Sequence, residues 1–228
     1  MKITTITNIE TSAKCNLACQ YCMSASQHKW RDTGLMDMDT FEATMKIVKK
    51  FVEAGTQREI NLFGVGEPLL NENIIEMIKI ARKTSPLWPL HLNTNAFFLT
   101  KEVADKLHTS GINHVDITGH DHFHTAEGIK ILRKAGIRFN VTYDFVISPN
   151  NWAGQVDWFP ADYKVVCPWI TRGQAFVMWN GDIVNCCFDA KSTNVLGNVK
   201  ENTFDEIKEI CIKEFELCKN CHQRIEGN

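Results

Sequence analysis

The sequence predicts an α/β fold, a partial (β/α) barrel of about five to six parallel strands followed by a small α+β module. Over the first two thirds of the chain, runs rich in β-branched residues alternate with amphipathic stretches of roughly 10–15 residues. Beyond Ile147 this pattern gives way to a cysteine-rich segment with a hairpin signal. Because strand–helix–strand units place neighbouring strands parallel, ligand sites are expected at the carboxyl ends of the strands.

Five segments have the composition of strands. The first alternates β-branched with polar residues, and the second runs directly into the glycine-rich turn Gly64–Pro68. The remaining three are short apolar runs that stand between helical segments. In chain order the expected strands are Ile3–Ile9, Glu59–Phe63, Trp88–Leu92, Ile112–Ile117 and Ile137–Ile147.

Four segments between these strands carry apolar residues at helical spacing. The first has Asp39 or Thr40 placed to cap it and Gly55 to end it. The third and fourth are closed by Gly111 and Gly136. In chain order the expected helices are Phe41–Val52, Ile74–Ala81, Lys101–Thr109 and His124–Ala135.

The change in composition predicts two domains, a barrel over residues 1–150 and a cysteine-rich domain over residues 151–228. The second is expected to contain a hairpin turn at Asn180–Asp182 and one short helix near Phe204–Ile212. Only about 60 residues follow Val166, which is at the low end of what folds alone. A bound metal commonly substitutes for core in a module of that size.

Composition excludes several function classes. The chain has 228 residues, of which 44% are hydrophobic and 23% charged, and its net charge of −2 offers nothing to attract a polyanion. It contains no run of about 18 apolar residues, and its first residues lack the apolar stretch of a signal peptide. We therefore expect a cytoplasmic protein with no nucleic-acid or membrane partner. In that reducing compartment, the nine cysteines indicate metal binding or catalysis rather than disulfides.

Cys15, Cys19 and Cys22 are spaced C-x3-C-x2-C in the loop after the first strand. Three thiolates on one loop can hold three irons of a cubane and leave its fourth iron open to a ligand. A zinc knuckle or three buried thiols is the alternative. Tetrahedral zinc needs four ligands, and the nearest histidine, His28, has no partner motif. The spacing favours an iron–sulfur cluster over zinc.

Two further motifs follow the next strands. Gly66-Glu67-Pro68 comes after the second strand and Leu92-Asn-Thr-Asn95 at the end of the third. With the cysteine loop, in which the aromatic Tyr21 precedes the last cysteine, they resemble the radical S-adenosylmethionine (radical SAM) superfamily over roughly residues 5–147. Taken alone, Gly66-Glu67-Pro68 is an ordinary turn.

The resemblance implies how a [4Fe–4S] cluster would bind S-adenosylmethionine (SAM). The open iron would take the amino and carboxylate groups of SAM, and the backbone at Gly66 and Glu67 would meet the amino group. Tyr21 would set the adenine through its backbone. Asn95 and Thr118 are candidates for the carboxylate and the ribose.

Six cysteines form a second group: Cys167, Cys186, Cys187, Cys211, Cys218 and Cys221. Cys218-Lys-Asn-Cys221 is a metal-ligand pair that rubredoxin-like, zinc-ribbon and redox motifs share. The longer pattern from Val177 to the final pair resembles the auxiliary-cluster modules called SPASM and Twitch. A full SPASM module, with two clusters, needs about seven cysteines, whereas the shorter Twitch needs about four.

The Twitch resemblance implies one auxiliary [4Fe–4S] cluster, an electron carrier or a structural staple, on Cys167, Cys186, Cys218 and Cys221. Cys186 is preferred because the ligand usually stands five residues after the hairpin glycine, here Gly181. Cys187 is the alternate ligand or a residue facing the pocket. The sixth thiol, at position 211, falls in the expected final helix, where a small buried apolar residue is expected.

His120 and His122 follow the fourth strand, where a substrate would lie. They could exchange protons near neutral pH or bind a metal, and the alternative is exposed loop histidines at a helix start. We consider them acid–base candidates together with Asp144 and Arg172. Four tryptophans of the tail region are expected to seal clusters and domain contacts: Trp152, Trp158, Trp169 and Trp179.

The resemblance implies an oxidoreductase that cleaves SAM reductively, using an electron from a flavodoxin or ferredoxin. It is greatest to the Twitch-bearing aminocyclitol dehydrogenases, which suggests net oxidation of a small sugar- or cyclitol-like molecule. Gly64, Val65, Asn93 and Cys187 depart from the aromatic pocket residues of that group. One alternative is a maturase or epimerase of a ribosomally made peptide, although the leader-gripping domain usual in such enzymes does not fit in this chain. Another is a non-catalytic iron or zinc module.

Overall fold

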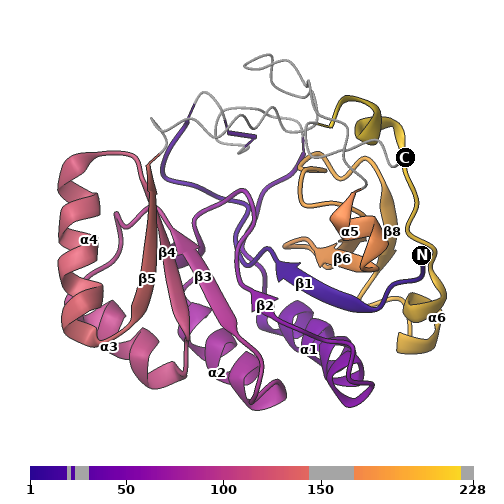
Figure 1. The fold of residues 1–228 in the computed structure, drawn as a ribbon, viewed down its shortest axis with the longest axis horizontal. Helices are drawn as coiled ribbons and strands as arrows, with labels where there is room; N and C mark the ends of the chain where they lie inside the picture. The colour runs from indigo at the N-terminus through magenta and orange to yellow at the C-terminus, as the bar shows by residue number, and fades with distance from the viewer. Residues whose placement is uncertain (20–21, 24–30, 144–166, 222–228) are drawn as a thin grey trace.

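The computed structural model describes residues 1–19, 22–23, 31–143 and 167–221, which build one mixed eight-stranded sheet in the order β5-β4-β3-β2-β1-β6-β7-β8 (Figure 1). The strands from β5 to β6 are all parallel, and β7 and β8 are antiparallel additions. The prediction of about five to six parallel strands is confirmed. The strands are β1 (Thr5–Ile9), β2 (Ile60–Asn61), β3 (Leu90–Thr94), β4 (His114–Gly119), β5 (Arg138–Tyr143), β6 (Gln174–Val177), β7 (Asp182–Val184) and β8 (Val195–Asn198).

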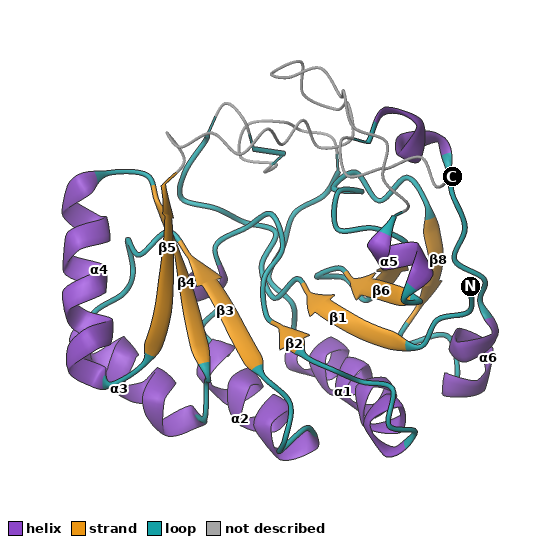
Figure 2. Ribbon diagram, viewed as in Figure 1, coloured by secondary structure: helices purple, strands orange, loops and turns teal. Residues whose placement is uncertain are grey.

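Helices α1 to α4 lie along one face of strands β1 to β5 (Figure 2). The helices are α1 (Met38–Glu53), α2 (Ile74–Thr84), α3 (Lys101–Ser110), α4 (His122–Ala135), α5 (Pro168–Thr171) and α6 (Phe204–Glu209), with 3₁₀ turns η1 (Pro68–Leu70) and η2 (Glu216–Asn220). Gly111 and Gly136 end α3 and α4 with φ of +90° and +70°, which confirms both stops. The cap of α1 is Asp37, not Asp39 or Thr40, because the Asp37 side chain accepts a hydrogen bond from the Thr40 N–H at 2.7 Å.

The main core lies between the sheet and these helices. Ile6 and Leu92 from the sheet and Phe41 from α1 are fully buried. The same apolar cluster continues to Val177 on β6 and Ile207 on α6. Burial of this continuous apolar surface supplies the main driving force for the fold.

Several element boundaries differ from the sequence prediction, among them those of β2, β3 and α6. Strand β2 has only two residues, and β3 begins at Leu90 because Pro89 has no N–H to donate to a neighbouring strand. Helix α6 ends at Glu209, before the expected Ile212. Cys211 is therefore exposed and pairs with Lys2 in an isolated bridge, so the prediction of a small buried residue there is wrong.

The C-terminal third extends the same sheet. Strand β6 pairs with β1 in parallel, with Ile6 opposite Ala175, and the Ile3 N–H, just before β1, donates to the Ile210 carbonyl at the end of α6 at 3.1 Å. The predicted boundary at residue 150 lies outside the described residues. Within the part of the chain that is described, no helix is long and apolar enough to span a membrane.

The long connection between β1 and α1 is fixed at both ends by Asn71. Its side chain, 1% exposed, donates to the carbonyl of Thr11 at 2.7 Å and to that of Met36 at 3.0 Å. Its Oδ1 accepts the N–H of Asn73 at 3.0 Å. One amide thus joins three segments of irregular backbone, in addition to the hydrogen bond from the Met36 N–H to the Thr11 carbonyl at 3.0 Å.

We expect Asn71→Leu to lower the free energy of unfolding by about 2–4 kcal/mol, because the Met36 carbonyl and the Asn73 N–H lose their hydrogen-bond partner and the Thr11 carbonyl keeps only the Met36 N–H. The measurement is anaerobic urea denaturation followed by circular dichroism. Asn73→Ala is the matched control, since the Asn73 side chain makes no capping hydrogen bond; it should cost less than about 0.5 kcal/mol. Equal midpoints for the two variants would contradict this role of Asn71.

Candidate active site

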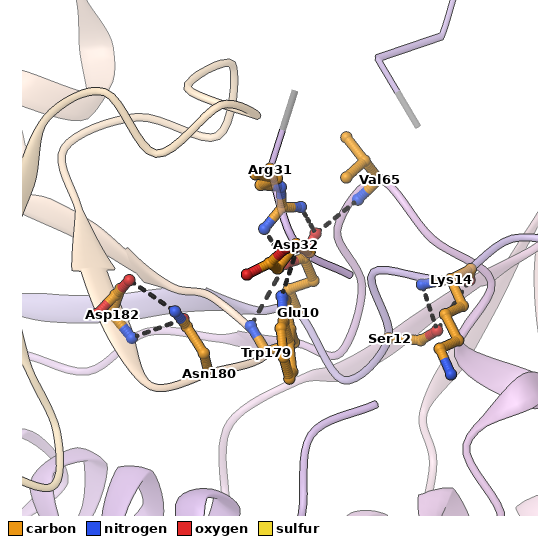
Figure 3. A network of polar contacts seen from close by, with 9 residues as sticks. All are labelled: Glu10, Ser12, Lys14, Arg31, Asp32, Val65, Trp179, Asn180 and Asp182. Carbon is orange, nitrogen blue, oxygen red and sulfur yellow. Dashed lines mark hydrogen bonds and ion pairs between the residues drawn. The ribbon is translucent and has the colours of Figure 1, made fainter. Parts of the chain in front are cut away.

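Glu10, the residue after β1, anchors the segment that returns from the cysteine loop (Figure 3). Its buried carboxylate forms a bidentate ion pair with Arg31, with N–O distances of 2.6 and 2.9 Å. Each oxygen also accepts a backbone N–H at 3.3 Å, from Val65 and from Trp179. Every favourable acceptor position of this carboxylate is used, so Glu10 holds structure together rather than binding a ligand.

Trp179, on the hairpin between β6 and β7, packs over the same returning segment. Its indole N–H donates to the Asp32 carbonyl at 3.3 Å, and a side chain at Gly34 would overlap its ring. The absence of a side chain at position 34 therefore lets the hairpin and the cysteine loop make close contact.

The three cysteines of the loop are half-buried at the carboxyl end of β1. The Cys22 N–H donates to the Cys19 carbonyl at 3.0 Å, which curls the loop. Cys19 Sγ lies 3.5 Å from His120 Nδ1, and Cys15 Sγ lies 3.9 Å from Asn95 Nδ2. Burial raises the pKa of the Cys15 thiol, and the nearby Glu67 carboxylate raises it further. A metal must displace the proton of such a thiol in order to bind.

Gly66 and Glu67 lie directly against this loop. A Cβ at position 66 would collide with the carbonyls of Ser12 and Lys14, and the Glu67 N–H donates to Lys14 C=O at 2.8 Å. Only glycine allows this approach of two backbones. The turn after β2 therefore sets the position of the chain just before Cys15.

The carboxylate of Glu67 also ties the turn to β3. It accepts the hydroxyl of Thr94 at 2.8 Å and the backbone N–H groups of Asn95 at 2.7 Å and Leu69 at 3.0 Å. Burial raises the pKa of Glu67, and these hydrogen bonds lower it in part. The Asn95 side chain is thereby held 2.8 Å from Asn16 Oδ1, beside the first cysteine.

The structure thus brings together the cysteine loop, Gly66-Glu67-Pro68, Asn95 and His120 at the carboxyl ends of β1 to β4. Thr118 is half-buried near the end of β4, two residues before His120. His122 is exposed at the first residue of α4. Tyr21 and Asp144 lie outside the described residues.

Arg172 does not belong to this site. Its side chain is exposed, and its carbonyl accepts the hydroxyl of Thr4 at 2.7 Å, just before β1 begins. Strands β1 and β6 are parallel, so this position is at their amino ends, opposite the cysteine loop. The prediction that Arg172 acts in catalysis is therefore corrected.

A second group of cysteines surrounds a cavity of about 410 Å³. Cys167, Cys186, Cys218 and Cys221 all line it, with apolar walls from Phe215 and Leu217 among others. In the described ranges, no three His, Cys, Asp or Glu side chains converge on a single metal ion. Thiols spread around a cavity instead fit a multi-iron cluster, in which each cysteine binds a different iron.

Cys187 lines a different cavity, of about 300 Å³, at the carboxyl ends of β1 and β2. Asn8, Glu10 and Gly64 are among its other lining residues. A hydrogen bond to Cys187 and burial together raise the pKa of Cys186 well above its ordinary value. The adjacent thiols therefore touch each other but line two different cavities.

Sequence reasoning missed Glu10, Arg31 and Asn71. Glu10 carried a weak signal, as an acidic residue where a predicted buried strand ends. Arg31 and Asn71 carried none, since their partners are 21 and 60 residues away in the chain.

Comparison with known proteins agrees with this geometry. The family model for the radical SAM superfamily matches residues 9–121, and that for SPASM, an iron–sulfur cluster-binding domain, matches residues 167–222. The two matches contain the two cysteine groups. The resemblance found in the sequence is confirmed.

Two curated relatives cover the chain differently. An S-adenosyl-L-methionine-dependent 2-deoxy-scyllo-inosamine dehydrogenase of Niallia circulans is 26% identical over 97% of this chain and 94% of its own length. A GTP 3′,8-cyclase of Sulfurimonas denitrificans is 34% identical over 48% of this chain, but the chain spans only 33% of that enzyme.

Solved structures share the fold. BtrN in complex with AdoMet and 2-DOIA superimposes with a TM-score of 0.77 at 22% identity, covering 98% of this chain and 88% of BtrN. The enzyme anSMEcpe with bound AdoMet has a TM-score of 0.64 at 16% identity, covering 95% and 86%. From the two family models, the chain belongs to the radical SAM superfamily and carries a SPASM-type iron–sulfur cluster-binding domain.

Proposed function

We propose that this protein is a radical SAM dehydrogenase that oxidises a secondary alcohol of a small cyclitol- or sugar-like molecule to a ketone. The observation that carries the proposal is the near full-length similarity to 2-deoxy-scyllo-inosamine dehydrogenase. Superfamily membership implies a SAM-binding [4Fe–4S] cluster and an auxiliary iron–sulfur cluster. When bound, they supply the cleavage of SAM to methionine and a 5′-deoxyadenosyl radical that abstracts hydrogen.

Residues of the first site would hold SAM and its cluster. Cys15, Cys19 and Cys22 would bind three irons and leave the fourth for SAM. The backbone at Gly66-Glu67-Pro68, braced by the Glu67 carboxylate, would receive the amino group of SAM. Asn95 would receive its carboxylate. Thr118 would contact the ribose, and Tyr21 the adenine.

The second cavity is the proposed substrate pocket. Its lining combines a few polar groups with apolar side chains, which is the composition typical of small-molecule sites. Asn8 supplies an amide, and Gly64 and Cys187 leave room where larger side chains would fill the space. His120, His122 and Asp144 are the candidate bases for the alcohol proton.

Oxidation of an alcohol removes two electrons, and the radical takes only one of them with the hydrogen atom. The second needs an acceptor, which we propose is a cluster on Cys167, Cys186, Cys218 and Cys221. Cys187 in the substrate pocket is the next residue after Cys186, and Trp169 of the cysteine cavity packs edge-on against Phe176 of the pocket at 6.0 Å between ring centroids. This adjacency supports electron transfer between the two.

Other features of the proposal concern the setting. We propose that residues 1–150 form the radical SAM domain and residues 151–228 the auxiliary-cluster domain. An external one-electron donor, such as a flavodoxin or ferredoxin, would reduce the first cluster. The cytoplasm is the proposed compartment, because all nine cysteines are free thiols.

Anaerobic reconstitution of the full chain should load about eight irons, as two [4Fe–4S] clusters. The triple variant Cys15→Ala/Cys19→Ala/Cys22→Ala and the single variant Cys186→Ala should each lose about half of them, by iron assay and Mössbauer spectroscopy. Cys187→Ala and Cys211→Ala are matched controls and should keep all. Loss of iron in Cys187→Ala with retention in Cys186→Ala would reverse the assignment of the adjacent thiols.

With dithionite, SAM and 2-deoxy-scyllo-inosamine deuterated at the reacting carbon, we expect the ketone and 5′-deoxyadenosine that carries deuterium. Cys218→Ala should still form 5′-deoxyadenosine but lose ketone formation, since only the second electron loses its acceptor. Both products are measured by mass spectrometry.

No 5′-deoxyadenosine from the reconstituted protein would contradict radical chemistry. Full ketone formation by Cys218→Ala would leave the second cluster with a structural role only. Deuterium transfer from a ribosomally made precursor peptide, but from no cyclitol or sugar, would favour the peptide maturase or epimerase instead.

A further inference from the structure

The cavity that the four cysteines line contains two side chains with buried, unpartnered polar atoms. Asn185 is 1% exposed, and neither its Nδ2 nor its Oδ1 has a hydrogen-bond partner among the described residues. The indole Nε1 of Trp169 is likewise buried without a partner within those ranges. Buried donors are nearly always paired in folded proteins, so two orphans in one cavity indicate a missing acceptor.

Both donor residues lie within two positions of a proposed cluster ligand in the sequence. Asn185 immediately precedes Cys186 at the end of β7, and Trp169 is two residues after Cys167, in α5. The two donors thus enter the cavity with ligands from separate elements. Packing in an apolar core does not account for either side chain, because burying an amide or an indole N–H without a hydrogen-bond partner costs free energy.

The cavity offers few acceptors for these N–H groups. Phe215 and Leu217 are apolar, and the remaining protein groups of the wall are thiols and the exposed Glu214. The sulfur atoms of a bound cluster and of its cysteine ligands would supply the acceptors that the protein lacks.

We propose that Asn185 and Trp169 donate N–H···S hydrogen bonds to the auxiliary cluster and raise its reduction potential. This proposal rests on the proposed cluster site. Reduction adds negative charge to the cluster sulfurs, and donors aimed at them stabilise the reduced form more than the oxidised form. The two residues are positioning residues that make the cluster a better acceptor of the substrate electron.

The test measures the midpoint potential of the auxiliary cluster by an EPR-monitored redox titration. The background is the full chain with Cys15→Ala/Cys19→Ala/Cys22→Ala, so that only the auxiliary cluster is present, and iron is counted first. Asn185→Leu keeps a similar volume and removes the amide, and Trp169→Phe keeps an aromatic ring and removes the indole N–H. Trp88→Phe is the matched control, because Trp88 packs under Arg58 just before β3 and does not line the cavity of the four cysteines.

We expect Asn185→Leu and Trp169→Phe each to shift the midpoint potential downward, and the double variant to shift it further. The iron–sulfur stretching bands in resonance Raman spectra should change in the same two variants and not in Trp88→Phe. If Asn185→Leu does not load iron, the midpoint potential of the auxiliary cluster in Trp169→Phe, the milder change, tests the proposal.

Two results would overturn the proposal, and they are distinguishable. Potentials of fully loaded Asn185→Leu and Trp169→Phe that equal that of Trp88→Phe would refute the hydrogen bonds while leaving the cluster site intact. Failure of the triple-cysteine background itself to load about four irons would overturn the auxiliary cluster and, with it, this proposal.

Discussion

The buried carboxylate of Glu10 joins three segments that meet at the carboxyl end of the sheet: the residues returning from the cysteine loop, the turn after β2 and the hairpin after β6. Removing one partner of such a buried ion pair typically costs about 3–5 kcal/mol, because the other charge is left unpaired. If Arg31 moved away, the Glu10 carboxylate would become exposed to solvent or would stay buried without its ion-pair partner. The cysteine loop is therefore fastened to the same residue as the C-terminal third.

The side chains of Glu67 and Asn71 form hydrogen bonds with buried backbone groups of the irregular loops. The loops that carry the candidate site are neither helix nor strand, yet several of their N–H and C=O groups are buried and must be paired. Glu67 pairs donors from β3 and η1, and Asn71 pairs carbonyls on both sides of the cysteine loop. Side-chain groups here take the place of a hydrogen-bond ladder.

Which features the sequence could predict depends on how far apart in the chain the interacting residues are. The helices and most strands depend on local periodicity, and the cysteine loop depends on spacing within eight residues, so both are visible in the chain. The pairing of β6 with β1 joins positions 169 residues apart, such as Thr5 and Gln174, and no local pattern encodes it. The prediction for Arg172 was wrong for the same reason, because the pairing of β6 with β1 places this residue at the amino ends of the two strands. Cys211 is exposed because α6 ends at Glu209, two residues earlier than that cysteine.

The position of the two adjacent thiols connects these levels. Cys186 lines the cavity of the four cysteines, while Cys187 packs with Phe176 and Met178 beside the pocket. Because β6 carries Phe176 and is paired with β1, the partition between the two cavities lies beside the strand that leads into the cysteine loop. The distance between the cavities is then set by packing of the sheet rather than by a flexible linker between domains. In the proposed reaction, a fixed and largely apolar partition of this kind would keep water away from the reactive radical and separate the substrate from the second cluster.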